Sequence, residues 1–207
     1  MAEIPLWLKW AREIQALAQT GLTFAHNEYE IDRNRRLMEI AAEIAAYHTD
    51  FGKEELLADM LAQPGYATPK IDVRSAVLRD GRILLVKERQ DGLWCMPGGW
   101  VDVGEGPAEA AAREVREESG YLVEPVKVVA VCDANRSGRP LQLYHAFKII
   151  FLCRLVGGDA LDSYETEGAD FFSFDALPPL SENRTHRRHL DMVRAHLIDP
   201  STPTFFD

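Results

Sequence analysis

One short helical segment constrains the fold and chemistry of this chain more than any other. Residues 99–121 read G-W-V-D-V-G-E-G-P-A-E-A-A-A-R-E-V-R-E-E-S-G-Y, which places Glu114, Glu117 and Glu118 at helical spacing. Residues three and four apart are neighbours on a helix, so the three carboxylates crowd a patch about 6 Å across. Their mutual repulsion requires a partner, and hard divalent cations favour oxygen ligands. The cluster therefore predicts a metal site.

The residues around the cluster predict the helix and its orientation. Pro107 suits the first helical position, and Gly120 suits the left-handed residue just past the end. A stripe of small apolar residues would let the helix lie close against a sheet, with the glutamates on another face: Ala108, Ala111, Ala112 and Val115. Before the helix, Pro97-Gly98-Gly99 permits a tight turn that a ligand can approach closely. For the E-x-x-E-E pattern alone, a solvated helix face is the alternative.

The complete string resembles the signature of the Nudix hydrolases, G-x5-E-x7-R-E-U-x-E-E-x-G-U, in which U is apolar. The fixed positions are all matched, by Gly99, Glu105, Arg113, Glu114, Glu117, Glu118 and Gly120, and Val115 is the first U. Tyr121 stands where an aliphatic residue is usual. The resemblance covers about residues 70–198. It implies an α/β fold, an α/β/α sandwich with a mixed sheet, and hydrolysis of a diphosphate bond by water.

The resemblance also implies a cofactor, Mg²⁺ or Mn²⁺, with Glu114, Glu117 and Glu118 as ligands. A main-chain carbonyl at Gly98 or Gly99 is expected to join them. Such metals neutralise the diphosphate and activate a bound water. The remaining signature residues, Glu105 and Arg113, are expected to orient the ligating carboxylates.

Resembling enzymes often take their general base from the loop before the last strand. Here that loop reads Y-E-T-E-G-A-D-F-F and offers Glu165 and Glu167. We prefer Glu165 as the base and Glu167 as an additional ligand, with Glu118 as the other catalytic carboxylate. The alternative is that both loop residues are simply solvated.

Three further residues are candidates for substrate binding. Arg74, in I-D-V-R-S-A-V, would grip a phosphate if it points inward, and would be solvated if it points outward. Arg184 is a second candidate for a phosphate contact. Trp100 either stacks on a base or a choline cation or packs on the sheet. His186 and His189 are expected on the surface of a basic helix.

The chain divides into two regions that differ in their pattern of apolar residues. Residues 1–66 predict a small all-helical N-terminal domain, whose first helix would end at Gly21, and 63–69 resemble a linker. Residues 70–207 form the hydrolase domain, and its first two strands are joined by an Asp80-Gly81 hairpin. Further elements are expected at the following positions: strands at 127–132, 144–155 and 169–174, and a helix from about 184 to 197.

The first region carries its own resemblance, through W-L-K-W-A-R-E-I-Q-A-L-A-Q-T-G-L-T-F, N-E-Y-E-I-D-R and G-Y-A-T-P-K-I-D-V-R. These stretches are similar to a bacterial Nudix subgroup with a helical cap, which hydrolyses nucleoside diphosphates linked to another moiety. The resemblance implies CDP-choline as the leading substrate, giving CMP and phosphocholine. ADP-ribose is the alternative, since Pro140 lies downstream of the signature as in ADP-ribose enzymes, although at a different offset. A non-catalytic nucleotide-sensing regulator on the same scaffold is an alternative of another class.

Composition excludes several classes of function. A formal net charge of −10 argues against general nucleic-acid binding. No apolar stretch approaches the roughly 20 residues that cross a bilayer. Three widely spaced cysteines, Cys95, Cys132 and Cys153, predict free thiols and a cytoplasmic protein. The amphipathic helices of the first region have more apolar surface than they can bury alone, so we expect a homodimer through them.

Overall fold

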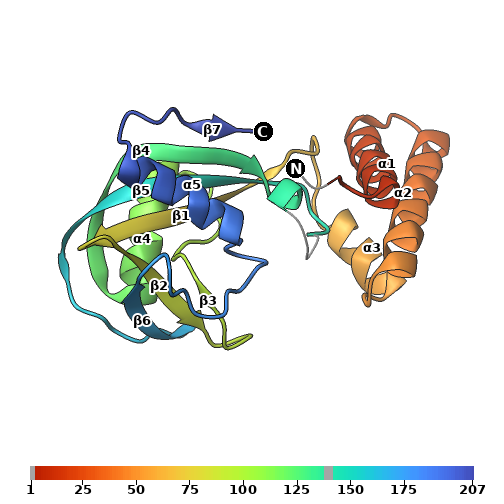
Figure 1. Cartoon of the computed structure of the whole chain (residues 1–207). Coiled ribbons are helices and arrows are strands. Elements are labelled where there is room, and N and C mark those ends of the chain that lie inside the picture. Colours follow the sequence, from red (N-terminus) through yellow and green to blue (C-terminus); the bar gives the residue numbers. More distant parts are fainter. Residues whose placement is uncertain (1–2, 138–141) are drawn as a thin grey trace. The chain divides into compact units, whose positions relative to one another are not determined.

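The computed structural model describes residues 3–137 and 142–207, so Pro140 lies outside the described residues (Figure 1). The chain divides into two compact units. The helical unit comprises Glu3–Pro69 together with Leu143–His145, and the sheet unit contains the rest of the described chain. No helix among the described residues is long and apolar enough to cross a membrane.

The helical unit consists of α1 (Leu6–Phe24), α2 (Glu28–His48) and α3 (Lys53–Leu61). Small side chains on α2 allow close packing, and the core contains Ala18, Met38, Ala41, Ala42, Ala45, Leu56 and Met60. Helix α1 continues through Gly21, so the predicted end at that residue is wrong. A Cβ at Gly21 would lie 2.2 Å from the side-chain oxygen of Asn34. The glycine therefore leaves room on α1 for the side chain of Asn34 from α2.

The short segment Leu143–His145 belongs to the helical unit although it lies between two strands of the other unit. The guanidinium of Arg12 donates to the main-chain carbonyls of Leu143 and Tyr144, at 2.8 and 2.5 Å. The Tyr144 hydroxyl lies 3.0 Å from a carboxylate oxygen of Asp59. Leu143 packs against the apolar core of the helices. The chain therefore returns to the helical unit after β4.

The sheet unit contains a seven-stranded mixed sheet. Strand β1 pairs in parallel with β5 and antiparallel with β2, in the order β3-β2-β1-β5-β4-β7, and β6 pairs with β2. The strands are β1 (Lys70–Arg79), β2 (Arg82–Glu88), β3 (Trp94–Cys95), β4 (Tyr121–Asp133), β5 (Ala146–Gly158), β6 (Thr166–Phe172) and β7 (Phe205–Phe206). A 3-10 turn, η1 (Ala134–Ser137), follows β4.

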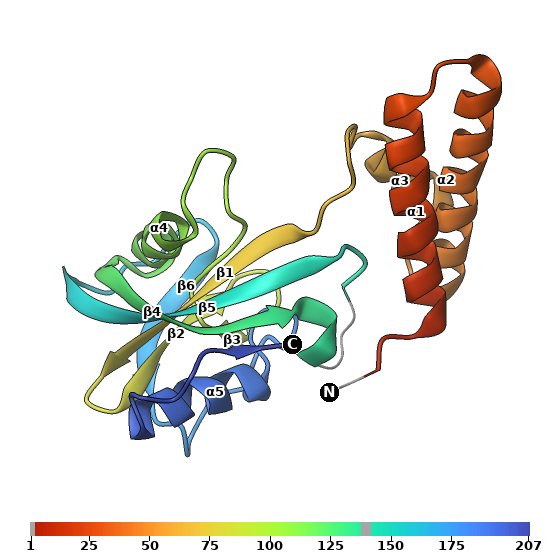
Figure 2. The ribbon, with the colours of Figure 1, turned by 90° about the horizontal axis from the view of Figure 1, so that it is seen from above.

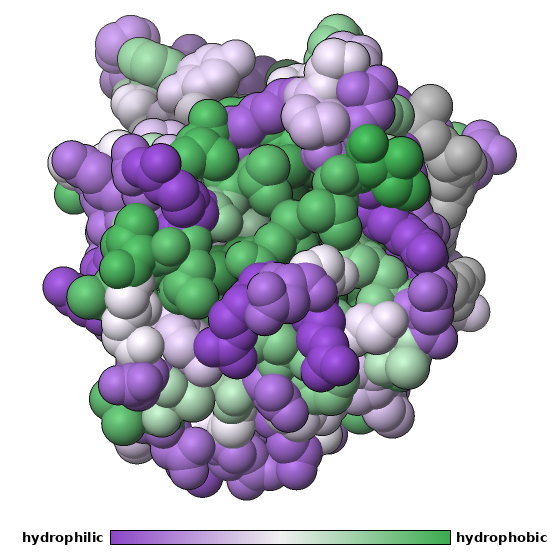
Figure 3. All heavy atoms as spheres, turned by 60° about the vertical axis from the view of Figure 1, so that its left-hand side comes forward, coloured by the Kyte–Doolittle hydropathy of each residue, from purple (hydrophilic) through white to green (hydrophobic). Residues whose placement is uncertain are grey.

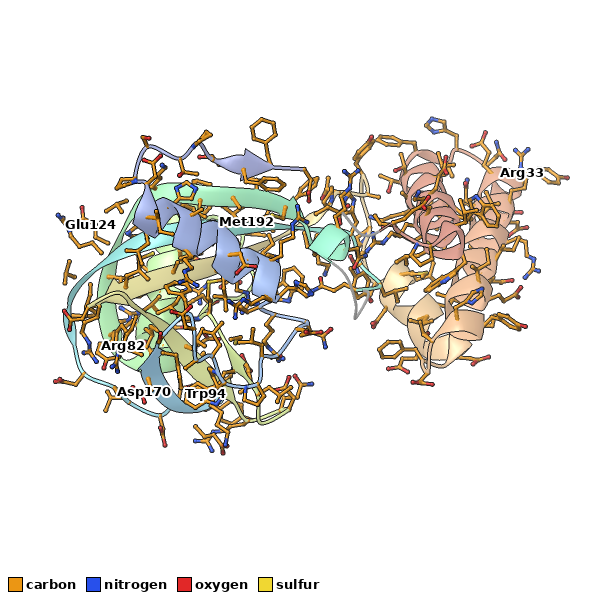
Figure 4. All side chains as sticks on the ribbon, viewed as in Figure 1. Arg33, Arg82, Trp94, Glu124, Asp170 and Met192 are labelled. Atoms are coloured by element: carbon orange, nitrogen blue, oxygen red, sulfur yellow. The ribbon has the colours of Figure 1, made fainter. Side chains whose placement is uncertain are left out.

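Helices α4 (Pro107–Ser119) and α5 (Arg187–Ile198) cover opposite faces of this sheet (Figure 2). Helix α4 packs through Ala110, Ala111 and Val115. Helix α5 packs through Leu190 and Val193, and Met192 contacts the same cluster (Figure 4). The predicted α/β/α sandwich with a mixed sheet, preceded by a helical region, is confirmed. Apolar side chains also gather around a hollow on one face of the surface (Figure 3).

Local signals placed the ends of α4 correctly. Pro107 begins the helix, and Gly120 follows it with φ +76°. The prediction that Ala108 packs on the sheet is wrong, because Ala108 is exposed. Ala110 is buried in its place. The hairpin at Asp80-Gly81 is also confirmed, with positive φ at both residues.

The C-terminal helix begins later than predicted and buries a histidine. The main-chain amides of Arg184 and Thr185 donate to the carbonyl of Ser181, which forms a turn, and α5 begins only at Arg187. The expectation that His189 lies on the surface is wrong, because it is 2% exposed on the face that packs on the sheet. Burial lowers the pKa of His189 to about 3, so the ring is neutral at neutral pH.

Candidate active site

A cavity of about 500 Å³ lies beside the acidic face of α4. It is bounded by the glycine loop (residues 97–99) before α4, the loop before β6 and the turn before α5. Its lining is predominantly charged: Arg74, Glu88, Gly98, Gly99, Trp100, Asp102, Arg113, Glu114, Glu117, Glu118, Ser163, Tyr164, Glu165 and Arg184. The structure thus brings together residues from five separate parts of the chain, of which residues 98–118 form one.

The three glutamates predicted as metal ligands all line this cavity, at different depths. Glu118 is 5% exposed, and one of its carboxylate oxygens accepts a hydrogen bond of 2.8 Å from the Gly98 amide. Burial raises its pKa to about 8, against the opposing effect of Arg74. Burial also raises the pKa of Glu114, again opposed by an arginine, Arg113. A cation in the cavity would favour the charged forms of both side chains.

The glycine loop packs directly on the backbone of β1. The amide of Val73 donates to the Gly99 carbonyl at 2.8 Å, and that of Ser75 donates to the Pro97 carbonyl at 2.9 Å. Gly98 has φ +146°, and a Cβ there would lie 2.0 Å from the Val73 carbonyl oxygen. Because the Gly99 carbonyl is engaged in this pairing, the Gly98 carbonyl is the better candidate for a ligand.

Arg113 lies among the carboxylates of the signature. Its guanidinium makes two bonds to Glu105, at 2.9 and 3.0 Å, and reaches Glu114 at 3.0 Å and Glu117 at 3.1 Å. These partners raise the pKa of Arg113, so it stays charged. In this arrangement Glu105 holds the arginine, and the arginine holds two of the expected ligands.

The two candidates for the general base are separated by the structure. Glu165 lines the cavity, together with its neighbours Ser163 and Tyr164. Glu167 lies on β6, where it pairs with Lys87 at 2.7 Å, and it is not part of the cavity lining. Glu165 precedes β6 in the loop, whereas Glu167 lies within the strand, so the two side chains have different surroundings. Glu165 is therefore the better candidate for the general base.

The candidates for substrate binding all reach the cavity. Arg74 is 5% exposed and points inward, so the solvated alternative is wrong. Trp100 is half exposed, with the Lys70 ammonium 6.0 Å from its ring. Arg184 pairs with Glu88 at 3.1 Å.

Sequence reasoning missed three buried charged residues around this cavity. Glu88, at the end of β2, is 4% exposed and lines the cavity. Asp72 and Lys148 lie behind the lining, 4% and 1% exposed. The i, i+2 spacing of Asp72 and Arg74 on one strand is a signal that could have paired them. Glu88 and Lys148 carry no comparable local signal, because their partners are distant in sequence.

The carboxylate set suits a divalent metal by donor type, because hard cations prefer oxygen ligands. As the side chains lie, no three histidine, cysteine, aspartate or glutamate residues within 3–137 and 142–207 are grouped so as to hold an ion. The ion pairs of Arg113 with Glu114 and Glu117 account for this arrangement. A bound cation would stabilise the carboxylate form of Glu118, which burial disfavours by raising its pKa.

Comparisons with known proteins agree along the whole chain. Residues 5–62 match a family model described as "UDP-X-like, N-terminal oligomerisation domain", and residues 69–193 match one described as "NUDIX domain". A putative ADP-ribose pyrophosphatase of Bacillus subtilis, YjhB, is 41% identical over 97% of each chain. The structure of an ADP-ribose pyrophosphatase from Streptococcus suis is 38% identical, with a TM-score of 0.62, over 68% of this chain and 100% of that one. A UDP-X diphosphatase structure is 29% identical, with a TM-score of 0.64, over 97% and 98% of the two chains.

Proposed function

The chain belongs to the Nudix hydrolases and is a pyrophosphatase, and we propose that it hydrolyses ADP-ribose to AMP and ribose 5-phosphate. One observation carries the proposal: a single cavity combines three carboxylates of the signature, Glu114, Glu117 and Glu118, with Arg74 and Arg184. Carboxylates suit metal binding, and arginines suit phosphate oxygens. Both kinds of group are needed to bind and cleave a diphosphate.

The names of two relatives support the choice of ADP-ribose as the substrate. YjhB, which matches along nearly its whole length, is named as a putative ADP-ribose pyrophosphatase, and the Streptococcus suis protein is named as an ADP-ribose pyrophosphatase. This supports ADP-ribose over CDP-choline, which the sequence had led us to expect. The complete carboxylate set also favours an enzyme over a nucleotide-sensing regulator.

A divalent cation, Mg²⁺ or Mn²⁺, would be held by Glu114, Glu117, Glu118 and the Gly98 carbonyl. When bound, it neutralises the diphosphate and lowers the pKa of a coordinated water. To hold a cation, Glu114 and Glu117 would have to release their ion pairs with Arg113. Arg113 would remain fixed by its paired bonds to Glu105.

The protein's own side chains supply the remaining steps. Arg74 and Arg184 bind the non-bridging oxygens of the diphosphate in the bound substrate. Glu165 accepts the proton of the attacking water. Trp100, half exposed at the cavity, stacks on an aromatic part of the substrate.

A panel of substrates tests the proposal. ADP-ribose, a UDP-sugar, CDP-choline and 8-oxo-dGTP are each assayed by phosphate release after phosphatase coupling, with Mg²⁺, Mn²⁺ or EDTA. We expect the highest kcat/KM on ADP-ribose, AMP as the nucleotide product, and loss of turnover in EDTA that either metal restores. A preference for 8-oxo-dGTP, or full turnover in EDTA, would contradict the proposal.

The helical unit supports self-association. Trp10, Leu17 and Phe24 recur every seven residues along one side of α1, and each is more than half exposed. Leu6 adds a fourth exposed apolar side chain near the start of the same helix. Because this region matches an oligomerisation domain, we propose that a second copy of the chain covers this face of α1 in a homodimer.

Introducing charge into that face should separate the subunits. We expect the double variant Trp10→Glu, Leu17→Glu to elute at the monomer mass at micromolar concentration, because two unpaired carboxylates cannot be buried in an apolar interface. The measurement is light scattering after size exclusion. Val156→Glu, at an exposed apolar position on β5, is the control and should stay dimeric. A dimer that survives the double substitution would exclude this face.

A further inference from the structure

Lys148, on β5, is the most deeply buried charged residue near the active site, at 1% exposure. Its ammonium donates to a carboxylate oxygen of Asp72 at 3.3 Å and to the main-chain carbonyl of Arg184 at 2.7 Å. Lysine is almost never fully buried unless it is paired. Removing an ammonium from water costs several kcal/mol, so its partners must matter to the fold or to the function.

The two partners of Lys148 lead to two of the three arginines that line the cavity, Arg74 and Arg184. Asp72 accepts bonds from Nε and Nη2 of Arg74, at 2.9 and 3.1 Å, so the guanidinium plane is fixed by a paired contact. On the other side, the bond to its carbonyl fixes the main chain of Arg184. One ammonium therefore connects two cationic groups from different parts of the chain.

The charges of this cluster do not cancel. Lys148 and Arg74 carry two positive charges against one negative charge on Asp72. His189, which is buried nearby, is neutral because burial, with a contribution from Lys148, lowers its pKa to about 3. Among Lys148, Arg74 and Asp72 there is thus one positive charge in excess, beside a cavity whose lining is otherwise rich in carboxylates. Such a charge is favourable when an anion occupies the cavity.

We propose that Lys148 is a positioning residue for diphosphate hydrolysis, which holds Arg74 through Asp72 and Arg184 through its carbonyl so that both guanidinium groups face the substrate's phosphates. The inference rests on the proposed function in one respect, namely that a diphosphate enters this cavity. Lys148 itself touches neither substrate nor metal, because it is not part of the cavity lining. Its effect is therefore expected on binding more than on the chemical step.

The chain offers a matched control for a purely structural role. Lys127, on β4, also holds main-chain carbonyls, those of Pro200 at 3.0 Å and Thr202 at 2.7 Å. It belongs to the same unit, and neither of these partners lines the cavity. Substitution of either lysine removes two anchoring bonds, but only Lys148 is connected to the arginines.

The experiment compares Lys148→Met and Lys127→Met in the full chain. For Lys148→Met we expect KM to rise at least about tenfold and kcat to change less than about threefold, both measured on the substrate with the highest kcat/KM. The reason is that the variant loses binding energy that is equal in the ground and transition states. The Kd for the same substrate in EDTA, measured by calorimetry without turnover, should rise by a similar factor. Lys127→Met should lower only the thermal midpoint. Equal KM and Kd for the two variants would overturn the proposal.

Two further variants keep the result interpretable. Lys148→Gln retains N–H donors without the charge, and we expect a smaller rise in KM; it replaces the methionine variant if that protein does not fold.

In an Arg184→Gln background, Lys148→Met should raise KM by a smaller factor than in the wild type, because the two act on one contact. Additive effects would overturn the connection through Arg184. A wild type inactive on every nucleoside diphosphate refutes the proposed function, whereas an active enzyme insensitive to Lys148→Met refutes this inference alone.

Discussion

Replacing Glu118 with glutamine should lower kcat/KM by about 10²- to 10³-fold, the cost of removing one group that stabilises charge in a transition state. The substitution keeps the shape of the side chain and an oxygen that can accept the Gly98 amide. It removes one negative charge from the carboxylate set proposed to hold the metal. Kinetics at saturating Mn²⁺ and metal titration by calorimetry measure the two effects separately. Near-wild-type values of both would refute the assignment of Glu118 as a ligand.

The same variant should be more stable than the wild type in EDTA at alkaline pH. The pKa of Glu118 is raised to about 8 from 4.5, so its protonated form is the one that the fold favours. Its contribution to the free energy of unfolding is complete below pH 4.5 and is lost as the pH rises through about 8. The thermal midpoint of Glu118→Gln relative to the wild type should therefore increase between pH 4.5 and 8.5.

An exposed carboxylate provides the control for this pH dependence. Glu124 lies at the surface of β4, beside Arg154 (Figure 4). Glu124→Gln removes one carboxylate from a position that is more than half exposed, so it is the control for the loss of a negative charge that is not buried. A pH-independent difference between Glu118→Gln and the wild type would show that burial of Glu118 is not what separates them.

Gly98→Ala should destabilise the protein by at least about 3 kcal/mol, the range of severe backbone strain and core overpacking. The new Cβ would lie 2.0 Å from the Val73 carbonyl oxygen and 2.9 Å from the Arg74 Cα. Both are backbone atoms of β1, so no side chain can rotate away. The measurement is the urea midpoint at constant m-value. Activity should fall as well, since the Gly98 amide holds Glu118.

A substitution at a second glycine is the control that separates the steric clash at Gly98 from the cost of a positive φ. Gly92 has φ +70°, and nothing lies within 4 Å of a Cβ placed there. Gly92→Ala should therefore cost only about 1 kcal/mol. If Gly98→Ala is no more destabilising than Gly92→Ala, the loop moves away from β1 without cost, and its tight packing is not required.

Features of the fold that depend on neighbouring residues could be predicted from the sequence. The ends of α4 follow from Pro107 and Gly120, and the first hairpin follows from Asp80-Gly81, because φ preferences and capping act within a few residues. The convergence of the α4 glutamates on a cavity follows from helical spacing in the same way.

Contacts between distant strands could not be predicted. Asp72, Glu88 and Lys148 lie on β1, β2 and β5, and only the register of the sheet brings them to one place. The errors at Gly21 and His189 have the same origin. In each case a long-range packing partner, α2 or the sheet, decided what a local preference could not.

The return of Leu143–His145 to the helices has a practical consequence for dissecting the protein. Cutting the chain at residue 69 would delete Arg12 and Asp59, and with them the anchors of Leu143 and Tyr144 in the connection between β4 and β5. That connection leads directly into the strand that carries Lys148. A shortened hydrolase could therefore lose affinity for its substrate even if the helices never approach the nucleotide. Truncation data would then need a full-length Arg12→Ala protein beside them to separate a missing tether from a missing subunit interface.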